Sequence, residues 1–247
     1  MSTTAVKSPT TPKMVLRPAA KRGHADHGWL KSAHSFSFAS YYDPQHTHFE
    51  ALRVINDDFV AAGGGFPPHP HQDFEIFSYV LEGQIEHKDS LGNGSVVGAG
   101  GIQFMTTGSG VRHSEYNPSQ TDDLRFLQIW LMPATRGARP RYEVKQLSPE
   151  EKAGKLALFI AEDGRDGAIR TLAPADVYAG TFDGEQATSF DIRRGRKAWL
   201  QMARGSASVN GQKLGRGDGL AIVEPGTVTI SEGQDAEILL FDLQTIS

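Results

Sequence analysis

The amino-acid sequence predicts an all-β fold made of two consecutive units of the sandwich or barrel type. Short apolar runs recur between clusters of Gly, Pro, Asn and Asp, as they do in chains that form many short antiparallel strands. The 247 residues include 27 glycines and 13 prolines, which suits a chain rich in turns. Long helical periodicity is absent. A chain of 247 residues can form one large domain or two of ordinary size, and we expect two.

The first half carries the clearest strand signals. Apolar runs at residues 51–54, 74–81, 101–105 and 124–132 are expected to form strands. The dipeptide Asn93-Gly94 gives the strongest turn signal, because Asn-Gly accepts the positive φ angles of a tight hairpin turn. This turn should connect a strand at residues 85–89 to a strand that begins after Ser95.

The second half is expected to begin after Pro133, where residues 135–140 lack apolar periodicity. Ser148, Pro149 and Glu151 then predict one short helix with a serine N-cap and a capping-box glutamate. Strands are expected again at residues 156–161, 198–203, 206–209, 219–223, 227–230 and 238–243. We therefore predict a flexible tail at residues 1–13, a first domain at residues 14–134 and a second at residues 135–247.

Composition argues against several classes of function. The formal net charge of -4 argues against a nucleic-acid partner, because phosphate binding usually needs a basic surface. No cysteine is present, so disulfides, thiolate ligands and a cysteine nucleophile are excluded. Residues 1–13 lack the apolar stretch of a secretion signal, and no window approaches the ~18 apolar residues that span a bilayer. We expect a cytoplasmic protein that binds neither nucleic acid nor membrane.

The histidines are confined to the first half. All nine lie between His24 and His113, and two pairs stand out among them, His69-Pro-His71 and His113-Ser-Glu115. A strand projects alternate side chains to one face, so both members of each pair can point into one cavity. Three imidazoles and a carboxylate suit iron, copper, nickel, manganese or zinc, whereas calcium and magnesium prefer oxygen ligands.

The two halves look like a degenerate internal repeat. In each, a Gly-rich turn leads to a strand, a second turn and a further strand. The position equivalent to His113 falls near residues 228–230 and is apolar. We therefore expect the second unit to have the same fold without the metal.

The motif contexts point to a known family. Residues 63–75 followed by Glu82-Gly83 resemble the first cupin motif, and residues 110–118 resemble the second, including its Gly-x-x-His and His-x-x-x-Asn spacings. A closer resemblance is to the pirin family of two-cupin proteins. It rests on GWL at 28–30, HSFSF at 34–38, YYDP at 41–44, HPHQDFE at 69–75, DSLGNG at 89–94 and MTTGSG at 105–110. This resemblance implies a bicupin, in which two tandem cupin barrels of the double-stranded β-helix or jelly-roll type face each other, with few short helices.

The resemblance also implies a set of metal ligands. His69, His71, His113 and Glu115 would hold one divalent ion, expected to be iron(II), with zinc, copper, nickel, manganese or cobalt as alternatives. Glu75 is the rival carboxylate, because many other cupins use a glutamate shortly after the His-x-His pair, and strand parity does not exclude it. Pirin-like proteins use the glutamate after the third histidine, which favours Glu115.

The remaining histidines lack this spacing. We expect them to be structural or to lie on the surface, with His46 and His48 in an exposed turn; they are His24, His27, His34, His46, His48 and His87.

Bacterial pirin-like proteins include quercetin 2,3-dioxygenases. The resemblance therefore implies a metal-dependent dioxygenase that cleaves a flavonol such as quercetin with dioxygen and releases carbon monoxide. Glu115 is expected to be the catalytic base that takes the proton of the flavonol 3-hydroxyl group. We expect a monomer, since fused cupin halves can cover each other.

Eukaryotic pirins imply an alternative function. In that class the protein would be a non-catalytic regulator whose metal senses the redox state and which binds protein partners. The negative net charge and the absence of a nuclear-type basic run favour the enzyme.

Overall fold

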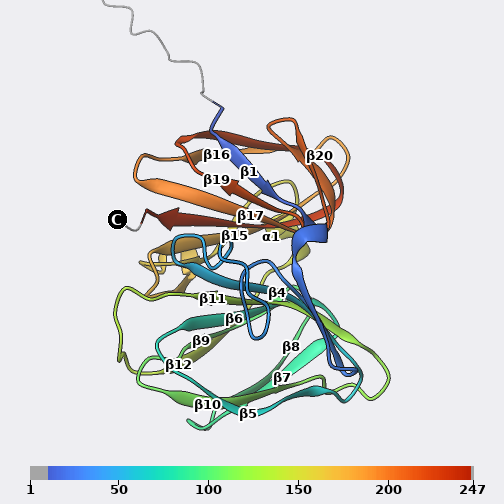
Figure 1. Ribbon diagram of the computed structural model, residues 1–247, viewed down its shortest axis with the longest axis vertical. Coiled ribbons are helices and arrows are strands. Elements are labelled where there is room, and N and C mark those ends of the chain that lie inside the picture. Colours follow the sequence, from blue (N-terminus) through green and yellow to red (C-terminus); the bar gives the residue numbers. More distant parts are fainter. Residues whose placement is uncertain (1–10, 246–247) are drawn as a thin grey trace, which may run out of the picture.

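The computed structural model describes residues 11–245 and confirms the predicted all-β class. Most of the tail predicted at residues 1–13 lies outside the described residues. The strands form three sheets, which Figure 1 shows stacked along the long axis of the molecule. Among the described residues no helix is both long and apolar enough to cross a membrane.

The C-terminal half forms a nine-stranded sheet, in the upper part of Figure 1. Its strands are β1 (Met14–Arg17), β13 (Ala157–Ala161), β14 (Ile169–Arg170), β15 (Ala175–Phe182), β16 (Thr188–Ile192), β17 (Arg196–Val209), β18 (Gln212–Gly215), β19 (Gly219–Ile222) and β20 (Gly226–Gln244). Three short helical segments accompany the strands: η1 (Ala19–Lys21), α1 (Pro149–Lys152) and η2 (Arg165–Gly167).

The N-terminal half is a sandwich of two antiparallel sheets. The larger has the order β12-β9-β6-β11-β4-β3-β2 and the smaller the order β5-β10-β7-β8. Their bounds are β2 (Gly23–Asp26), β3 (Leu30–His34), β4 (Leu52–Val60), β5 (Gly65–His71), β6 (Glu75–Glu82), β7 (Gln84–Asp89), β8 (Gly94–Gly98), β9 (Gly101–Thr106), β10 (Val111–Tyr116), β11 (Leu124–Leu131) and β12 (Arg141–Gln146). In Figure 1 the larger sheet lies between the smaller sheet and the C-terminal half.

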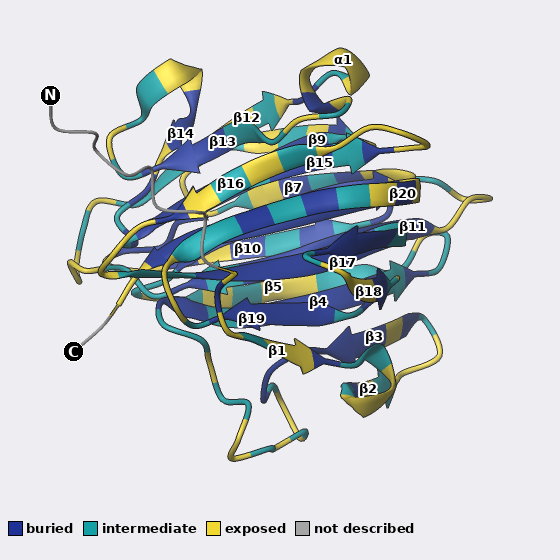
Figure 2. Ribbon diagram, turned by 90° about the horizontal axis from the view of Figure 1, so that it is seen from above, coloured by how far each residue is buried: buried dark blue, intermediate teal, exposed yellow. Residues whose placement is uncertain are grey.

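A continuous apolar core joins the two halves. The ring of Phe77 on β6 lies 5.9 Å from that of Phe159 on β13 and 6.5 Å from that of Phe241 on β20. Burial of these aromatic surfaces is the main favourable contribution at such an interface. Figure 2 shows that β4, β11 and β19 are largely buried, whereas the connecting loops at the periphery are exposed.

Two strands pair with the sheet of the other half. The strand β1 pairs with β19 in the C-terminal sheet, and β12 pairs with β9 in the N-terminal one. The predicted domain bounds at residues 14–134 and 135–247 stay a prediction, but this exchange means that each half is completed by a segment from the opposite side of the boundary.

The predicted strands at 198–203 and 206–209 are one long strand, β17, and those at 227–230 and 238–243 are one strand, β20. The sequence suggested a break because glycine and charged residues interrupt the apolar runs. In the structure these residues form bulges instead: Gly205, Glu232 and Asp235 have positive φ angles, and the register of β17 shifts around Gly205. The bulges bend the strands without ending them.

Two local predictions are confirmed, one with a change in detail. The helix α1 has Ser148 as its N-cap and a complete capping box with Glu151. The hairpin connects β7 to β8, but the positive φ angle is at Gly92 and not at Asn93 or Gly94. The cause is Asp89, whose carboxylate accepts hydrogen bonds from the backbone and side-chain amides of Asn93 and so sets the shape of the turn.

Candidate metal centre

His69 and His71 lie on β5, the edge strand of the smaller sheet. This strand contains three prolines, which lack the N–H group that a central strand requires and are therefore tolerated at an edge or a bulge. On β10, His113 is opposite His69, whereas Glu115 is opposite Phe66, so β5 carries one extra residue over this interval. The bulge accommodates two of the prolines and leaves both histidines on the inner face.

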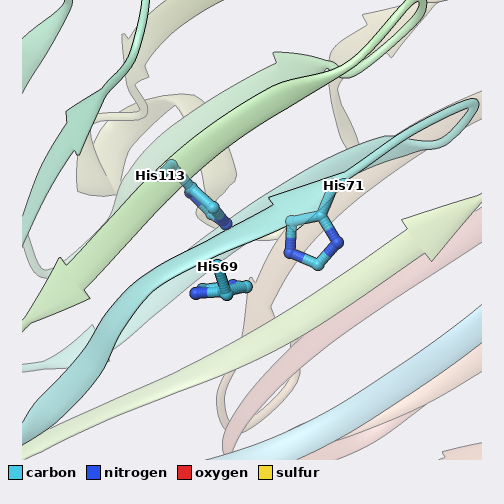
Figure 3. A group of neighbouring side chains, drawn as sticks. All are labelled: His69, His71 and His113. Carbon is cyan, nitrogen blue, oxygen red and sulfur yellow. The ribbon is translucent and has the colours of Figure 1, made fainter.

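The three histidines converge, as Figure 3 shows. Their ring centroids are 4.7 Å apart for His69 and His71, 4.5 Å for His69 and His113, and 5.0 Å for His71 and His113. One nitrogen atom from each ring lies within 4.8 Å of the other two. His113 is buried, while His69 and His71 are partly exposed, so the cluster is open on the side of β5.

Glu115 lies at the buried end of the cluster. Its carboxylate belongs to a second, overlapping group of possible ligands together with His113 and His87. One carboxylate oxygen accepts hydrogen bonds from Ser78 at 3.0 Å and Gln103 at 2.5 Å, and the other accepts one from Gln128 at 3.2 Å. Two carboxylate oxygens have about four lone-pair positions, so capacity remains for a metal ion or a proton.

The local electrostatics keep imidazoles of the cluster in the form that binds metals. Burial, together with the neighbouring His113 and His69 rings, lowers the pKa of His71 to about 3. Burial and the nearby rings of His69 and His87 also lower the pKa of His113 to about 3. Two of the three rings are therefore neutral at physiological pH and have a free lone pair for a cation.

The cluster fits a bound metal ion at two specific atoms. His113 Nε2 is buried and has no hydrogen-bond partner, which is costly unless a ligand satisfies it. His69 Nδ1 lies 2.8 Å from the Pro67 carbonyl oxygen, which can only accept, so Nδ1 carries the proton and Nε2 has the lone pair. Such an anchoring hydrogen bond from the second ring nitrogen is typical of metal-binding histidines.

Glu75, the rival carboxylate, belongs to neither group of possible metal ligands. It is fully buried and faces the C-terminal half, where it accepts hydrogen bonds from the Thr171 hydroxyl at 3.1 Å and the Leu172 amide at 3.0 Å. Thr106 donates a third. Burial raises the pKa of Glu75, although these hydrogen bonds oppose the change. Its contacts are those of a residue that joins the two halves.

Two residues near the cluster were not singled out from the sequence. His87 on β7, which was expected to be structural or on the surface, is buried, and its Nδ1 lies 3.3 Å from that of His113. Trp130 on β11 has its ring centroid 4.8 Å from that of His71 and in turn contacts Phe74 and Phe38. Only the sheet pairing brings these residues together. His46 and His48, by contrast, lie near the surface in a turn, as expected.

The cavities next to the cluster differ greatly in size. A space of about 10 Å³ adjoins His113 and Glu115, which is roughly what one water molecule needs. An open depression of about 420 Å³ lies beside His71 and is lined by Pro70, His71, Gln72, Ser90, Gly110, Val111 and Arg112. Only the second is large enough for a small organic molecule.

In the C-terminal half, the position expected to correspond to that of His113 lies in an apolar core. Val228 and Ile230 are buried in its core cluster. Among the described residues, the groups of possible metal ligands both lie in the N-terminal half.

Comparison with known proteins agrees with this architecture. The chain is 46% identical over 231 residues to a quercetin 2,3-dioxygenase of Escherichia coli, covering 94% of this chain and 99% of that protein. It is 42% identical over 229 residues to a pirin-like protein of Caulobacter vibrioides, covering 92% and 97%. The crystal structure of a bacterial pirin from Escherichia coli in complex with nickel(II) superposes with a TM-score of 0.90 at 45% identity, covering 95% of this chain and 100% of that one.

The fold and the histidine cluster define a metal-binding protein with two cupin domains. The sequence profile described as pirin matches residues 15–131, and that described as a quercetinase C-terminal cupin domain matches residues 158–243. The chain belongs to the pirin family.

Proposed function

We propose that the protein is a metal-dependent dioxygenase that cleaves a flavonol such as quercetin with dioxygen and releases carbon monoxide. The observation that carries the proposal is the convergence of His69, His71 and His113, with His113 Nε2 buried and without a partner. The relative named quercetin 2,3-dioxygenase supports it, since the similarity extends over 94% of the chain.

The proposed ligands are His69, His71, His113 and Glu115, and we propose iron(II) as the native metal. Three imidazoles and one carboxylate are a donor set that suits iron as well as the nickel(II) found with a relative. When bound, the ion would supply Lewis acidity and redox chemistry at the open positions of its coordination shell.

We place the flavonol on the open side of the cluster. The space beside Glu115, at about 10 Å³, excludes a ring system, whereas the depression of about 420 Å³ beside His71 can take one. The ring of Trp130 lies edge-on to His71, which is one of the residues that line this depression.

Glu115 would take the proton of the flavonol 3-hydroxyl group through one water molecule, because the space of about 10 Å³ beside it can hold a water but not a ring. Its three hydrogen-bond donors, which are Ser78, Gln103 and Gln128, fix the carboxylate orientation and leave lone pairs free. A base held in this way transfers a proton without first reorganising its surroundings, and general-base catalysis of this kind typically contributes about 10²–10⁴-fold to the rate. The ring that loses this proton becomes electron-rich and reactive towards dioxygen.

Turnover tests the proposal directly. Iron(II)-loaded protein is expected to consume dioxygen and release carbon monoxide in equal amounts when quercetin is added, and His113→Ala is expected to abolish both because the buried ligand is lost. Metal-replete protein that neither consumes dioxygen nor releases carbon monoxide would refute the proposal. If the same inactive protein bound a protein partner only with oxidised metal, the regulatory alternative would replace it.

The native metal and the oligomeric state need separate measurements. Elemental analysis of protein purified without added metal is expected to find iron at one ion per chain. Light scattering is expected to give the mass of one chain, since the two cupin halves already cover each other through the core around Phe77.

A further inference from the structure

His87 is buried next to the histidine cluster, although no motif in the sequence indicates that it lies there. It lies on β7, is 1% exposed and stacks on the ring of Tyr142, with the centroids 4.2 Å apart and the planes 8° from parallel. Its Nδ1 lies 3.3 Å from His113 Nδ1, and its Nε2 lies 3.4 Å from Asp89 Oδ2. A buried histidine with both nitrogens in contact with polar partners has a fixed protonation pattern.

The hydrogen-bond chemistry determines where each proton lies. An ionised Asp89 carboxylate can only accept, so His87 Nε2 carries a proton. In a neutral ring the lone pair is then on His87 Nδ1, which must accept its hydrogen bond from His113 Nδ1. A neutral His113 that is protonated at Nδ1 has its own lone pair on Nε2, the buried atom that has no partner within the described protein.

The opposite arrangement is unfavourable. If His87 Nδ1 donated to His113 Nδ1, the neutral His113 would carry its single N–H proton on Nε2. That N–H group would be buried without an acceptor, since Nε2 has no hydrogen-bond partner. A buried donor that lacks a partner costs on the order of 1–3 kcal/mol.

We infer that Asp89 and His87 form a hydrogen-bonded chain that fixes the tautomer and orientation of His113, which makes His87 a positioning residue for the metal site. The inference rests on the proposed role of His113 as a ligand. Each hydrogen bond of this chain joins two protein side chains.

The β7–β8 turn anchors this chain. Asp89 accepts hydrogen bonds from the Leu91 amide at 2.9 Å, the Asn93 amide at 3.0 Å and the Asn93 side chain at 2.8 Å. These donors hold the carboxylate in position on the far side of His87. The turn motif at residues 89–94 therefore has a function beyond reversing the chain.

Two substitutions at His87 separate positioning from packing. His87→Phe keeps a flat ring that can stack on Tyr142 but removes the acceptor for His113. His87→Asn loses the stacking ring, yet its side-chain oxygen can occupy the place of Nδ1 and accept. With nickel(II) as the probe, chelator competition is expected to show roughly 10–100-fold weaker binding for His87→Phe, and recovery of most of that loss for His87→Asn.

Nuclear magnetic resonance of metal-free protein labelled with nitrogen-15 histidine reads the tautomer itself. In the wild type, His113 is expected to carry its proton on Nδ1 in all molecules. In His87→Phe, it is expected to be a mixture of the Nδ1-protonated and Nε2-protonated tautomers. A purely structural role of His87 would lower the melting temperature without changing the tautomer of His113. A wild-type His113 protonated on Nε2 would overturn the inference.

The outcomes also separate this inference from the proposed function. Wild-type protein that binds no nickel(II) refutes the metal site as a whole. Wild-type protein that binds nickel(II) no more tightly than His87→Phe refutes only the positioning role. If His87→Phe does not fold, Asp89→Asn is used instead. An asparagine amide can donate a hydrogen bond to His87 Nε2, which permits the other tautomer of His87. Unchanged nickel(II) affinity in Asp89→Asn would contradict the inference.

Discussion

Glu115 and Glu75 are both buried glutamates close to a histidine motif, yet their surroundings give them different roles. Glu115 lies beside His113 among three amide and hydroxyl donors, whereas Glu75 accepts hydrogen bonds from Thr171 and Leu172 of the other half. A short distance along the sequence from His69-x-His71 therefore does not identify the carboxylate that lies next to the histidine cluster.

Replacing each carboxylate with an amide distinguishes the role of Glu115 from that of Glu75. Glu115→Gln is expected to lower metal occupancy and to reduce kcat for quercetin by roughly 10²-fold or more, because a negatively charged ligand and a base are lost together. Glu75→Gln is expected to keep full occupancy and activity. Elemental analysis and carbon monoxide release measure the two properties, and a fully loaded, active Glu115→Gln protein would exclude Glu115 from the site.

Asp58 should make stability depend on pH. It is 2% exposed, and burial, with smaller contributions from Asp57 and Glu115, raises its pKa to about 7 despite a hydrogen bond from Ser32. Between the ordinary value of 3.8 and about 7, the folded state binds a proton that the unfolded state releases. This stabilisation is complete below about pH 4 and is lost as the pH rises through 7.

Asp58→Asn removes that titration. Urea denaturation of metal-free protein measures the free energy of unfolding of the wild type and of Asp58→Asn at pH 5 and at pH 8. The wild-type value minus the variant value is expected to fall by on the order of 1–3 kcal/mol from pH 5 to pH 8. A difference that stays constant or grows with pH would show that Asp58 is charged in the folded protein.

The residues differ in how far sequence alone could place them. The spacing of two in His69-x-His71 is enough to predict that both rings face one side of a strand, and the structure confirms that His113 joins them. His87 could not be placed in this way. Its approach to His113 depends on the antiparallel pairing of β7 with β10, in which His87 lies opposite Glu115, and no local pattern encodes that register.

At the scale of elements, the pairing of β5 with β10 builds the metal site. Gly65 is opposite Tyr116 in this pair, and a Cβ atom at Gly65 would lie 2.4 Å from the Tyr116 ring and 2.5 Å from the Glu115 carbonyl oxygen. Backbone must move to relieve the second contact. A larger residue at position 65 would therefore push apart the strands that carry His69 and His113.

Gly65→Ala is expected to weaken nickel(II) binding roughly tenfold or more, since small displacements of ligand-bearing elements cost this much. Gly98→Ala on β8 of the same sheet is the matched control, because a Cβ atom there has its nearest neighbours at 4.0 Å and the backbone φ is not positive. Isothermal titration calorimetry compares the two. Equal affinities would mean that the β5–β10 spacing does not control the site.

The sequence predicts that a strand is present more reliably than it predicts where the strand begins and ends. The apolar runs at 74–81 and 101–105 correspond closely to β6 and β9. The breaks predicted inside β17 and β20 were wrong, because a glycine or charged residue with positive φ can form a bulge in a continuing strand. Whether a bulge or a turn results depends on the neighbouring strands, which are distant in sequence.

At the scale of the whole molecule, a buried ion pair of the C-terminal half contacts the N-terminal half through Tyr79. Lys152 from α1 lies 2.7 Å from Glu237 on β20, and Tyr79 from β6 donates a hydrogen bond to the same carboxylate at 2.6 Å. Lys152 and Glu237 are 6% and 8% exposed. Removing one partner of such a pair leaves a buried charge without compensation.

Glu237→Gln is expected to lower the free energy of unfolding by about 3–5 kcal/mol. The double variant Lys152→Met/Glu237→Leu is expected to restore most of that loss, because it replaces the two buried charges with apolar side chains, while Arg204, which also contacts Glu237, keeps its ion pair with Glu82. Chemical denaturation measures both proteins. A single variant as stable as the wild type would show that this ion pair does not contribute to the stability of the protein.

The two cupin halves differ in the residues that they carry. The N-terminal half carries the histidine cluster, while Val228 and Ile230, at the position of the C-terminal half expected to correspond, are part of an apolar core. The C-terminal half nonetheless contacts the N-terminal half at Glu75, which accepts a hydrogen bond from it. It also contributes β12, whose Tyr142 stacks on His87. We expect the C-terminal half to be needed for a stable site although it provides no ligand.

We propose that one metal ion is held jointly by His69, His71, His113 and Glu115. Anomalous X-ray diffraction from crystals of the nickel(II)-loaded protein tests this most directly. The predicted result is a single strong anomalous peak bounded by the three imidazole rings and the Glu115 carboxylate. A peak bounded by His87 or Glu75 in place of these residues, or no peak at the cluster, would contradict the account.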